Sequence, residues 1–257
     1  MGIQVLEEET QVKQEIVDIF RRKVKGQRPM RREGDHDGAQ GQWLETLFGL
    51  KANGNNAPDF KGFELKNDTR AKTTFGDWQA SWYIFNRSTG QCSRSEFFRI
   101  FGAPNPEKNN RYSWSGKPSP KVGFWNDFGQ ILIVRDDHSV DALYSFPRDK
   151  RHNKHEVVPE KFQSEELVIG RWEQERLKTL VERKFNKSGW FKCLKDDSGA
   201  YVELVFGPPM TFESFIEQVK LGKIYLDSGM YEGNFRPYQP WRADNSFWNG
   251  LIVDRYS

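Results

Sequence analysis

The chain has 257 residues, of which 29% are charged and 36% hydrophobic, and its formal net charge is +3. An aromatic content of 14% argues against a disordered chain, and so small a net charge excludes a histone-like polycation. The length allows one large core and does not require two domains.

The small number of cysteines and the lack of long apolar stretches indicate the cellular compartment in which the protein works. Cys92 and Cys193 fit neither a metal-ligand spacing nor a disulfide framework, so we expect reduced thiols. The N-terminal sequence lacks an apolar signal core, and no apolar stretch approaches the roughly 18 residues that a membrane span needs. The sequence therefore predicts a soluble, cytoplasmic protein without membrane contact.

The N-terminal part is predicted to be helical and basic. Hydrophobic spacing predicts an amphipathic helix over residues 5–25. Basic residues without an intervening acid occupy its end and the following loop: Arg21, Arg22, Lys23, Lys25, Arg28, Arg31 and Arg32. Such a run is either a solvated face or a contact for a polyanion. A short helix over 42–50 and a strand over 60–66 come next.

The middle of the chain alternates strands with one helix. An aromatic, β-prone segment predicts a strand over 73–86, and a serine-capped pattern predicts a helix over 93–101. Residues 103–121 are rich in Pro, Asn, Lys and Ser and predict a long loop. Two strands that meet in a hairpin or a meander are predicted over 121–137 and 142–149.

The most regular helical pattern lies in the C-terminal half, over residues 170–185. Its predicted buried stripe consists of Trp172, Leu177, Leu180, Val181 and Phe185. A β-hairpin over 189–207, a helix over 211–222 that glycine closes, and a strand over 223–231 follow. The chain is expected to end in a closing strand.

Residues 57–66, APDFKGFELK, contain the pattern that bears most directly on function. Side chains alternate along a strand, so Glu64 and Lys66 share one face while the apolar residues between them face the core. Gly62 permits a bend that brings Asp59 towards the same edge. Two carboxylates and a lysine can therefore converge.

Such a group suits phosphodiester hydrolysis. Mg²⁺ prefers oxygen ligands and acidifies its bound water, and a nearby ammonium can stabilise charge in the transition state. Glu45, on the short helix upstream, could complete the shell of the cation from the other side. Taken alone, the pattern is also compatible with an ordinary half-exposed strand.

The segment DGAQGQWLETLFG, followed by APDFKGFELK, resembles the MvaI/BcnI group of type II restriction endonucleases and their relative MutH, a mismatch-repair nicking enzyme. In that group a Gly-Gln-x-x-Glu helix precedes an Asp…Glu-x-Lys strand within the PD-(D/E)xK nuclease fold. The resemblance covers most of residues 35–230. It implies that Asp59 and Glu64 bind Mg²⁺, that Lys66 is the catalytic lysine, and that Glu45 is the helix glutamate near the active site.

The resemblance also implies a fold and a domain organisation. The fold class is α/β (α+β), a restriction-endonuclease-like mixed central sheet flanked by helices, with decorating DNA-binding loops. We expect one domain over 1–257, with an N-terminal helix and basic arm over 1–34 and a catalytic core over 35–230. Residues 231–257 would form a DNA-contacting loop and the closing strand.

The function that follows is Mg²⁺-dependent cleavage of double-stranded DNA at a short, pseudopalindromic site, by a monomer or a homodimer in a prokaryotic cytoplasm. Three alternatives use the same core. They are a MutH-like strand-nicking enzyme of DNA repair, a DNA-binding protein with an inactive nuclease core, and a nuclease that acts on RNA.

The C-terminal tail carries the side chains best suited to reading bases. Guanidinium forks pair with guanine, and amides and aromatic rings add further contacts. The candidates are Arg236, Tyr238, Trp241, Arg242 and Asn245. Arg31, Arg32 and Lys117 are expected to hold phosphates, which positions the duplex without reading it. The chain departs from the family in carrying RADNSFWNG where the relatives have a His-Asp-x-Gly stretch that touches DNA.

Overall fold

The computed structural model describes residues 2–29, 38–50, 56–69, 71–86 and 90–257. The chain forms two compact units. The first unit comprises Met1–Thr73, Leu180–Thr211 and Asp244–Ser257, and the second comprises Thr74–Thr179 and Phe212–Ala243. The organisation expected from the sequence, one domain with an N-terminal part over 1–34, a catalytic core over 35–230 and a C-terminal part over 231–257, stays a prediction. No helix in the described residues is long and apolar enough to cross a membrane.

The first unit is built on a four-stranded sheet with the strand order β1-β9-β10-β14. Its strands are β1 (Phe63–Asn67), β9 (Gly189–Lys195), β10 (Tyr201–Gly207) and β14 (Asp254–Tyr256). β1 runs parallel to β9, and the other pairs are antiparallel. The predicted hairpin of β9 and β10 is confirmed, and its turn ends at Gly199, whose φ of +83° favours glycine.

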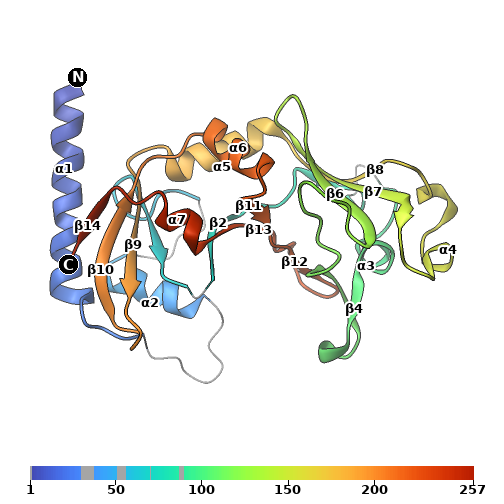
Figure 1. Cartoon of the computed structure of the whole chain (residues 1–257), viewed down its shortest axis with the longest axis horizontal. Coiled ribbons are helices and arrows are strands. Elements are labelled where there is room, and N and C mark those ends of the chain that lie inside the picture. Colours follow the sequence, from blue (N-terminus) through green and yellow to red (C-terminus); the bar gives the residue numbers. More distant parts are fainter. Residues whose placement is uncertain (1, 30–37, 51–55, 70, 87–89) are drawn as a thin grey trace. The chain divides into compact units, whose positions relative to one another are not determined.

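Helices cover this sheet because each has one apolar face. α1 (Gly2–Ile19) continues into a π-helical turn (Phe20–Val24), and α2 is shorter (Ala39–Leu47). α1 lies beside β14 and β10 in Figure 1, and the side chain of Lys13 donates to that of Asp254 at 2.9 Å. One core cluster joins apolar side chains of α1 and α2 to those of the strands. Both predicted N-terminal helices are confirmed.

The second unit contains three small sheets. A four-stranded antiparallel sheet has the order β3-β8-β7-β6, with β3 (Trp82–Tyr83), β8 (Leu167–Trp172), β7 (Val140–Asp149) and β6 (Phe128–Val134). A second sheet has the order β12-β5-β4, with β12 (Gly229–Tyr231), β5 (Arg111–Ser115) and β4 (Ala103–Asn105). The third has the order β11-β13-β2, with β11 (Ile224–Leu226), β13 (Pro240–Asp244) and β2 (Lys72–Asp77).

Short helices complete the chain. They are α3 (Arg94–Phe101), α4 (Lys154–Val157), α5 (Gln174–Phe185), α6 (Phe212–Lys220), α7 (Asn245–Asn249) and the 3-10 turns Pro106–Lys108 and Glu160–Phe162. α3 begins with a capping box, in which Ser93 and Glu96 satisfy each other's backbone N–H groups, so the predicted serine cap is confirmed. The last turn of α5, from Leu180, belongs to the first unit.

Four sequence predictions need correction. The predicted strand over 73–86 is two strands, β2 and β3, which belong to different sheets. Residues 103–121 contain the strands β4 and β5 rather than only a loop, because Trp114 is fully buried and donates to the side chain of Gln130 at 2.6 Å. Trp172 ends strand β8, and the helix begins only at Gln174. The predicted strand over 223–231 is two strands, β11 and β12, in different sheets. The mixed α+β architecture itself is confirmed.

Candidate active site

A tight turn places Asp59 beside strand β1. Phe60 and Phe63 exchange backbone hydrogen bonds at 2.9 and 2.8 Å. Lys61 and Gly62 between them have φ values of +43° and +99°, as the central residues of a type I′ turn do. The turn folds the chain back, and the backbone N–H of Leu65 donates to Asp59 Oδ2 at 3.0 Å. The predicted bend at Gly62 is confirmed.

Strand β1 buries both of its faces. Glu64 and Lys66 are only 2% and 6% exposed, and the alternating Phe63 and Leu65 are buried too. A carboxylate and an ammonium out of water are costly unless they are paired. Lys66 Nζ meets this requirement by donating to Glu64 Oε1 at 2.9 Å.

A second ammonium reaches the same oxygen from the end of α5. Lys184 Nζ lies 3.0 Å from Glu64 Oε1. Its position follows from the strand pairing, because Phe63 opposes Gly189 and the Ser188 N–H donates to Gly62 O at 3.2 Å, so α5 ends next to the start of β1. Two lysines therefore share one carboxylate oxygen. Within the described part of the chain, Glu64 Oε2 is buried and has no hydrogen-bond partner.

The carboxylates of this cluster repel one another. Burial, and secondarily the charge of Glu64, raise the pKa of Asp59 to about 7, although both lysines and the Leu65 N–H act against the rise. Partial burial and Glu64 also raise the pKa of Glu45, against the influence of Lys184 and Lys66. Glu45 on α2 is thus electrostatically coupled to Glu64 and to both lysines, whereas its role at the active site stays a prediction. Negative charge here is more than the lysines offset, so the cluster favours a proton or a cation.

Aromatic rings enclose the Lys66 side chain. Its Nζ lies 4.9 Å from the ring centroid of Phe185, at the end of α5, and 5.9 Å from that of Trp248 in α7. Burial lowers the pKa of Lys66, and the like charge of Lys184 lowers it further, whereas Glu64 opposes both. Cation–π contacts partly replace the lost hydration.

Sequence reasoning missed Lys184, Phe185 and Trp248. The one available signal was the amphipathic pattern of α5, which places Lys184 three residues after the buried Val181 and next to the buried Phe185. That pattern shows that Lys184 borders the buried face of its helix, but it does not reveal which strand that face meets.

A metal site is not preformed in the described residues. In that part of the chain, no three His, Cys, Asp or Glu side chains gather closely enough to hold an ion. The assignment of Asp59 and Glu64 as ligands therefore stays a prediction. The donor set nevertheless fits a hard cation, because it offers carboxylate oxygens and one buried acceptor atom without a donor.

The residues predicted to contact DNA lie in different environments. Arg236 and Tyr238 are exposed, and Arg236 pairs with Asp77. Arg242 is mostly buried, with its Nε 3.0 Å from Asp227 Oδ2 and its Nη2 3.4 Å from the Tyr238 hydroxyl. Lys117 is exposed.

The remaining predicted contacts fit that role less well or lie elsewhere. Trp241 is fully buried, 5.5 Å from the ring of Trp172, and such burial does not suit a base contact. Asn245 uses its amide within the first unit, donating to Thr69 O and accepting from Thr73 Oγ1 at 3.0 Å. Arg31 and Arg32 lie outside the described residues.

Comparisons with known proteins agree with the geometry. A family model described as LlaMI restriction endonuclease matches residues 22–256. The chain is 46% identical over 264 residues to the type II restriction enzyme ScrFI of Lactococcus lactis subsp. cremoris, covering 94% of this chain and 97% of that protein. It also resembles restriction endonuclease MvaI in complex with its cognate DNA substrate, with a TM-score of 0.61 at 12% identity, covering 97% of this chain and 98% of the other.

The structural likeness confirms the restriction-endonuclease-like fold that the sequence predicted. The family match spans nearly the whole chain, including every residue of the cluster around Glu64. The chain therefore belongs to the LlaMI restriction endonuclease family, and it is a site-specific deoxyribonuclease of the restriction type.

Proposed function

We propose that this enzyme cuts both strands of double-stranded DNA at a short, near-palindromic site, in a reaction that requires Mg²⁺. The observation that carries the proposal is the buried carboxylate of Glu64. Two lysines hold its Oε1, while Oε2 has no hydrogen-bond partner in the described residues. A buried acceptor of this kind calls for an explanation, and a hard cation supplies one.

Asp59 and Glu64 would hold the ion, with Glu45 as a third carboxylate in the same electrostatic field. Bound Mg²⁺ supplies an acidified water and a Lewis-acid contact to the scissile phosphate. The raised pKa values of Asp59 and Glu45 support this proposal, because added positive charge would favour the ionised form of both groups.

The lysines have separate tasks. Lys66 is almost completely buried and donates to Glu64, so it fixes the carboxylate, and its ammonium can stabilise negative charge on the phosphate. The Lys184 side chain is 19% exposed against 7% for that of Lys66. Lys184 therefore lies at the solvent side of the pair and places a second positive charge beside Glu64.

DNA recognition is assigned to the exposed part of the predicted set. Arg236 and Tyr238 are exposed, and the partly exposed Arg242 contacts the Tyr238 hydroxyl, so these three residues of the second unit are the candidates for reading bases. Lys117, with Arg31 and Arg32, is retained for phosphate contacts. Asn245 is retained as a weaker candidate for a DNA contact, and Trp241 is assigned to the hydrophobic core instead.

The test is incubation of the protein with a plasmid and Mg²⁺, followed by sequencing of the fragment ends. One recurrent end sequence is expected. Asp59→Ala and Glu64→Ala should each abolish cutting while DNA binding remains measurable. Asp197→Ala, in the exposed turn between β9 and β10, is the matched control and should cut normally. Turnover by either active-site variant would remove the assigned ligands.

A MutH-like nicking activity is the second candidate, because each chain carries one such cluster around Glu64. One active site facing two strands requires either a dimer or reorientation between the two cuts. Linear plasmid produced by the purified protein alone excludes the nicking enzyme, whereas open circles alone would favour it. Binding without cutting would indicate an inactive core, and faster cutting of RNA would indicate an RNA nuclease. Sedimentation with a cognate duplex separates the monomer from the homodimer.

A further inference from the structure

The turn between β12 and β13 exposes a complete aromatic side chain. Phe235 is 102% exposed, whereas Phe124, another exposed phenylalanine of the second unit, is 56% exposed. Leaving a phenyl group in water forgoes about 2 kcal/mol of burial energy. A lone exposed apolar residue on a mobile loop needs no explanation, so the order of this turn decides whether the exposure has meaning.

The turn is tied down by the first residue of α3. Arg94 Nη1 donates to the backbone oxygens of Asn234 and Phe235 at 2.8 and 3.2 Å, and Nη2 donates to Asn234 Oδ1 at 2.6 Å. One guanidinium thus fixes the peptide groups on both sides of Phe235. A planar, always charged fork is well suited to this task.

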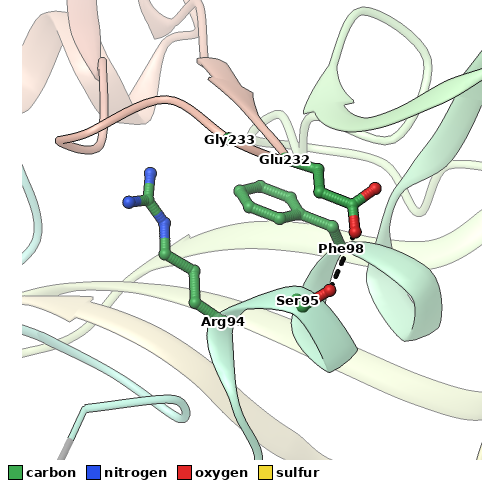
Figure 2. A pocket seen from close by; sticks show the side chains of 5 residues that line it. All are labelled: Arg94, Ser95, Phe98, Glu232 and Gly233. Atoms are coloured by element: carbon green, nitrogen blue, oxygen red, sulfur yellow. Dashed lines mark hydrogen bonds between the residues drawn. The ribbon is translucent and has the colours of Figure 1, made fainter.

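The base of the turn has its own supports, and Figure 2 shows those that lie between α3 and the residues Glu232 and Gly233. The Ser95 hydroxyl donates to Glu232 Oε1 at 2.8 Å, and the Arg94 and Phe98 side chains lie beside Glu232 and Gly233. The Gly229 N–H donates to Tyr238 O at 2.9 Å, which ties together the two ends of the segment that contains the turn. Phe235 therefore projects from a braced turn and not from a loose one.

Basic side chains surround this turn. Arg99 and Arg236 are 63% and 65% exposed, and Arg111 stacks on the Tyr231 ring with its guanidinium carbon 3.5 Å from the ring centroid. With Arg94 there are more cations than the two acids they contact, Glu232 and Asp77. An apolar ring within an electropositive rim complements a nucleic acid, which presents flat bases between phosphates.

We propose that Phe235 is a preformed stacking element that contacts the face of a base in double-stranded DNA, and that Arg94 is the positioning residue that holds it. The proposal rests on the proposed function, since it names a specificity contact of the same enzyme. A ring held in place loses little entropy on binding, and stacking on a base contributes about 1–3 kcal/mol. Where the Phe235 ring inserts between two neighbouring base pairs, those two base pairs lose their stacking on each other.

The test measures binding and base stacking separately. The probe is a duplex that contains the sequence found at the plasmid ends, with 2-aminopurine placed in turn through the site, in EDTA. Phe235→Ala should weaken binding about 5- to 150-fold, which is the stacking energy expressed as an affinity ratio. Phe235→Trp should retain tight binding. Phe124→Ala is the matched control and should change the affinity less than twofold.

The 2-aminopurine signal distinguishes stacking from a merely structural role. The wild-type protein should change the fluorescence at one position, and Phe235→Ala should abolish that change. Arg94→Met should weaken the same fluorescence change, because the ring is then no longer held in place. Equal affinity and equal fluorescence for Phe235→Ala and the wild type would overturn the proposal.

Failure of the proposed function would look different. In that case the wild-type protein itself would neither cut the plasmid nor bind the duplex, and no comparison of variants would arise. Unchanged DNA binding by Phe235→Ala together with capture of a second copy of the chain, lost in the same variant, would assign the ring to a protein contact and would also refute the proposal.

Discussion

Replacing Asp59 by asparagine is expected to remove a pH dependence from the stability of the metal-free enzyme. The pKa of Asp59 is about 7 in the folded protein and about 3.9 in an unfolded chain. A difference of about three units corresponds to about 4 kcal/mol. Since Asp59 is only partly buried and its titration is coupled to that of Glu64, roughly half of this value, about 2 kcal/mol, is the expected effect.

The sign follows from proton linkage. Below about pH 4 the Asp59 carboxyl is protonated in both states, and its favourable contribution to stability is fully present. Between about pH 4 and 7 the unfolded chain ionises first, so the free energy of unfolding falls as the pH rises. Above about pH 7 both states are ionised and the loss is complete. Asp59→Asn should therefore be more stable than the wild type by roughly 2 kcal/mol at pH 8 and nearly equal to it at pH 4.

The assay is urea unfolding in EDTA at several pH values, with Asp197→Asn as the exposed control. Only the difference between variant and wild type is interpreted, because other groups titrate in both proteins. Added Mg²⁺ should stabilise the wild type more at pH 8 than at pH 5, since the ion takes the place of the proton. The difference in the free energy of unfolding between Asp59→Asn and the wild type should therefore change with pH. If this difference stays constant from pH 4 to 8, the raised pKa of Asp59 is refuted.

Three further changes probe the lysine pair, base reading and phosphate binding. Lys184→Met should lower the stability of the metal-free enzyme by about 1–3 kcal/mol in thermal unfolding, because Glu64 loses one of its two ammonium partners. Lys184→Arg should restore most of the lost stability. An unchanged melting temperature of Lys184→Met would show that the ion pair between Lys184 and Glu64 contributes nothing to stability. Arg242→Ala should weaken cognate binding by about 1–3 kcal/mol and non-cognate binding less, whereas equal losses would make it a phosphate contact. Glutamine at the exposed Arg21, Arg22 and Lys23 should flatten the salt dependence of DNA binding by about 0.9 per lost phosphate contact, and an unaltered slope would leave these residues as a solvated face.

Two of these predictions address neighbouring groups for different reasons. Asp59 reports the burial of its own carboxyl and, secondarily, the charge of Glu64, whereas Lys184 reports how the charge of Glu64 is partly neutralised. Because both act on Glu64, their effects should not add, and a double variant is expected to deviate from the sum of the single changes.

The local part of the candidate active site could be predicted from the sequence. The period of two along β1 places Glu64 and Lys66 on one face, and Gly62 allows the turn that returns Asp59, so these contacts depend on only eight consecutive residues, 59–66. The resemblance to the MvaI/BcnI group implied that Glu45 lies near the site, and its electrostatic coupling to Glu64 is consistent with that expectation. Contacts between residues that are close in the sequence depend on the local backbone conformation, so a short sequence motif is enough to predict them.

The tertiary structure decided what meets that motif. Lys184, Phe185 and Trp248 reach it because β1 pairs in parallel with β9 and α5 ends just before β9. No local pattern specifies that pairing. The same holds for Trp241, since an aromatic residue suits both a core and a binding surface, and only packing against Trp172 made it core. Sequence periodicity shows which face of an element is buried, whereas the contacts between distant elements depend on how the whole chain packs.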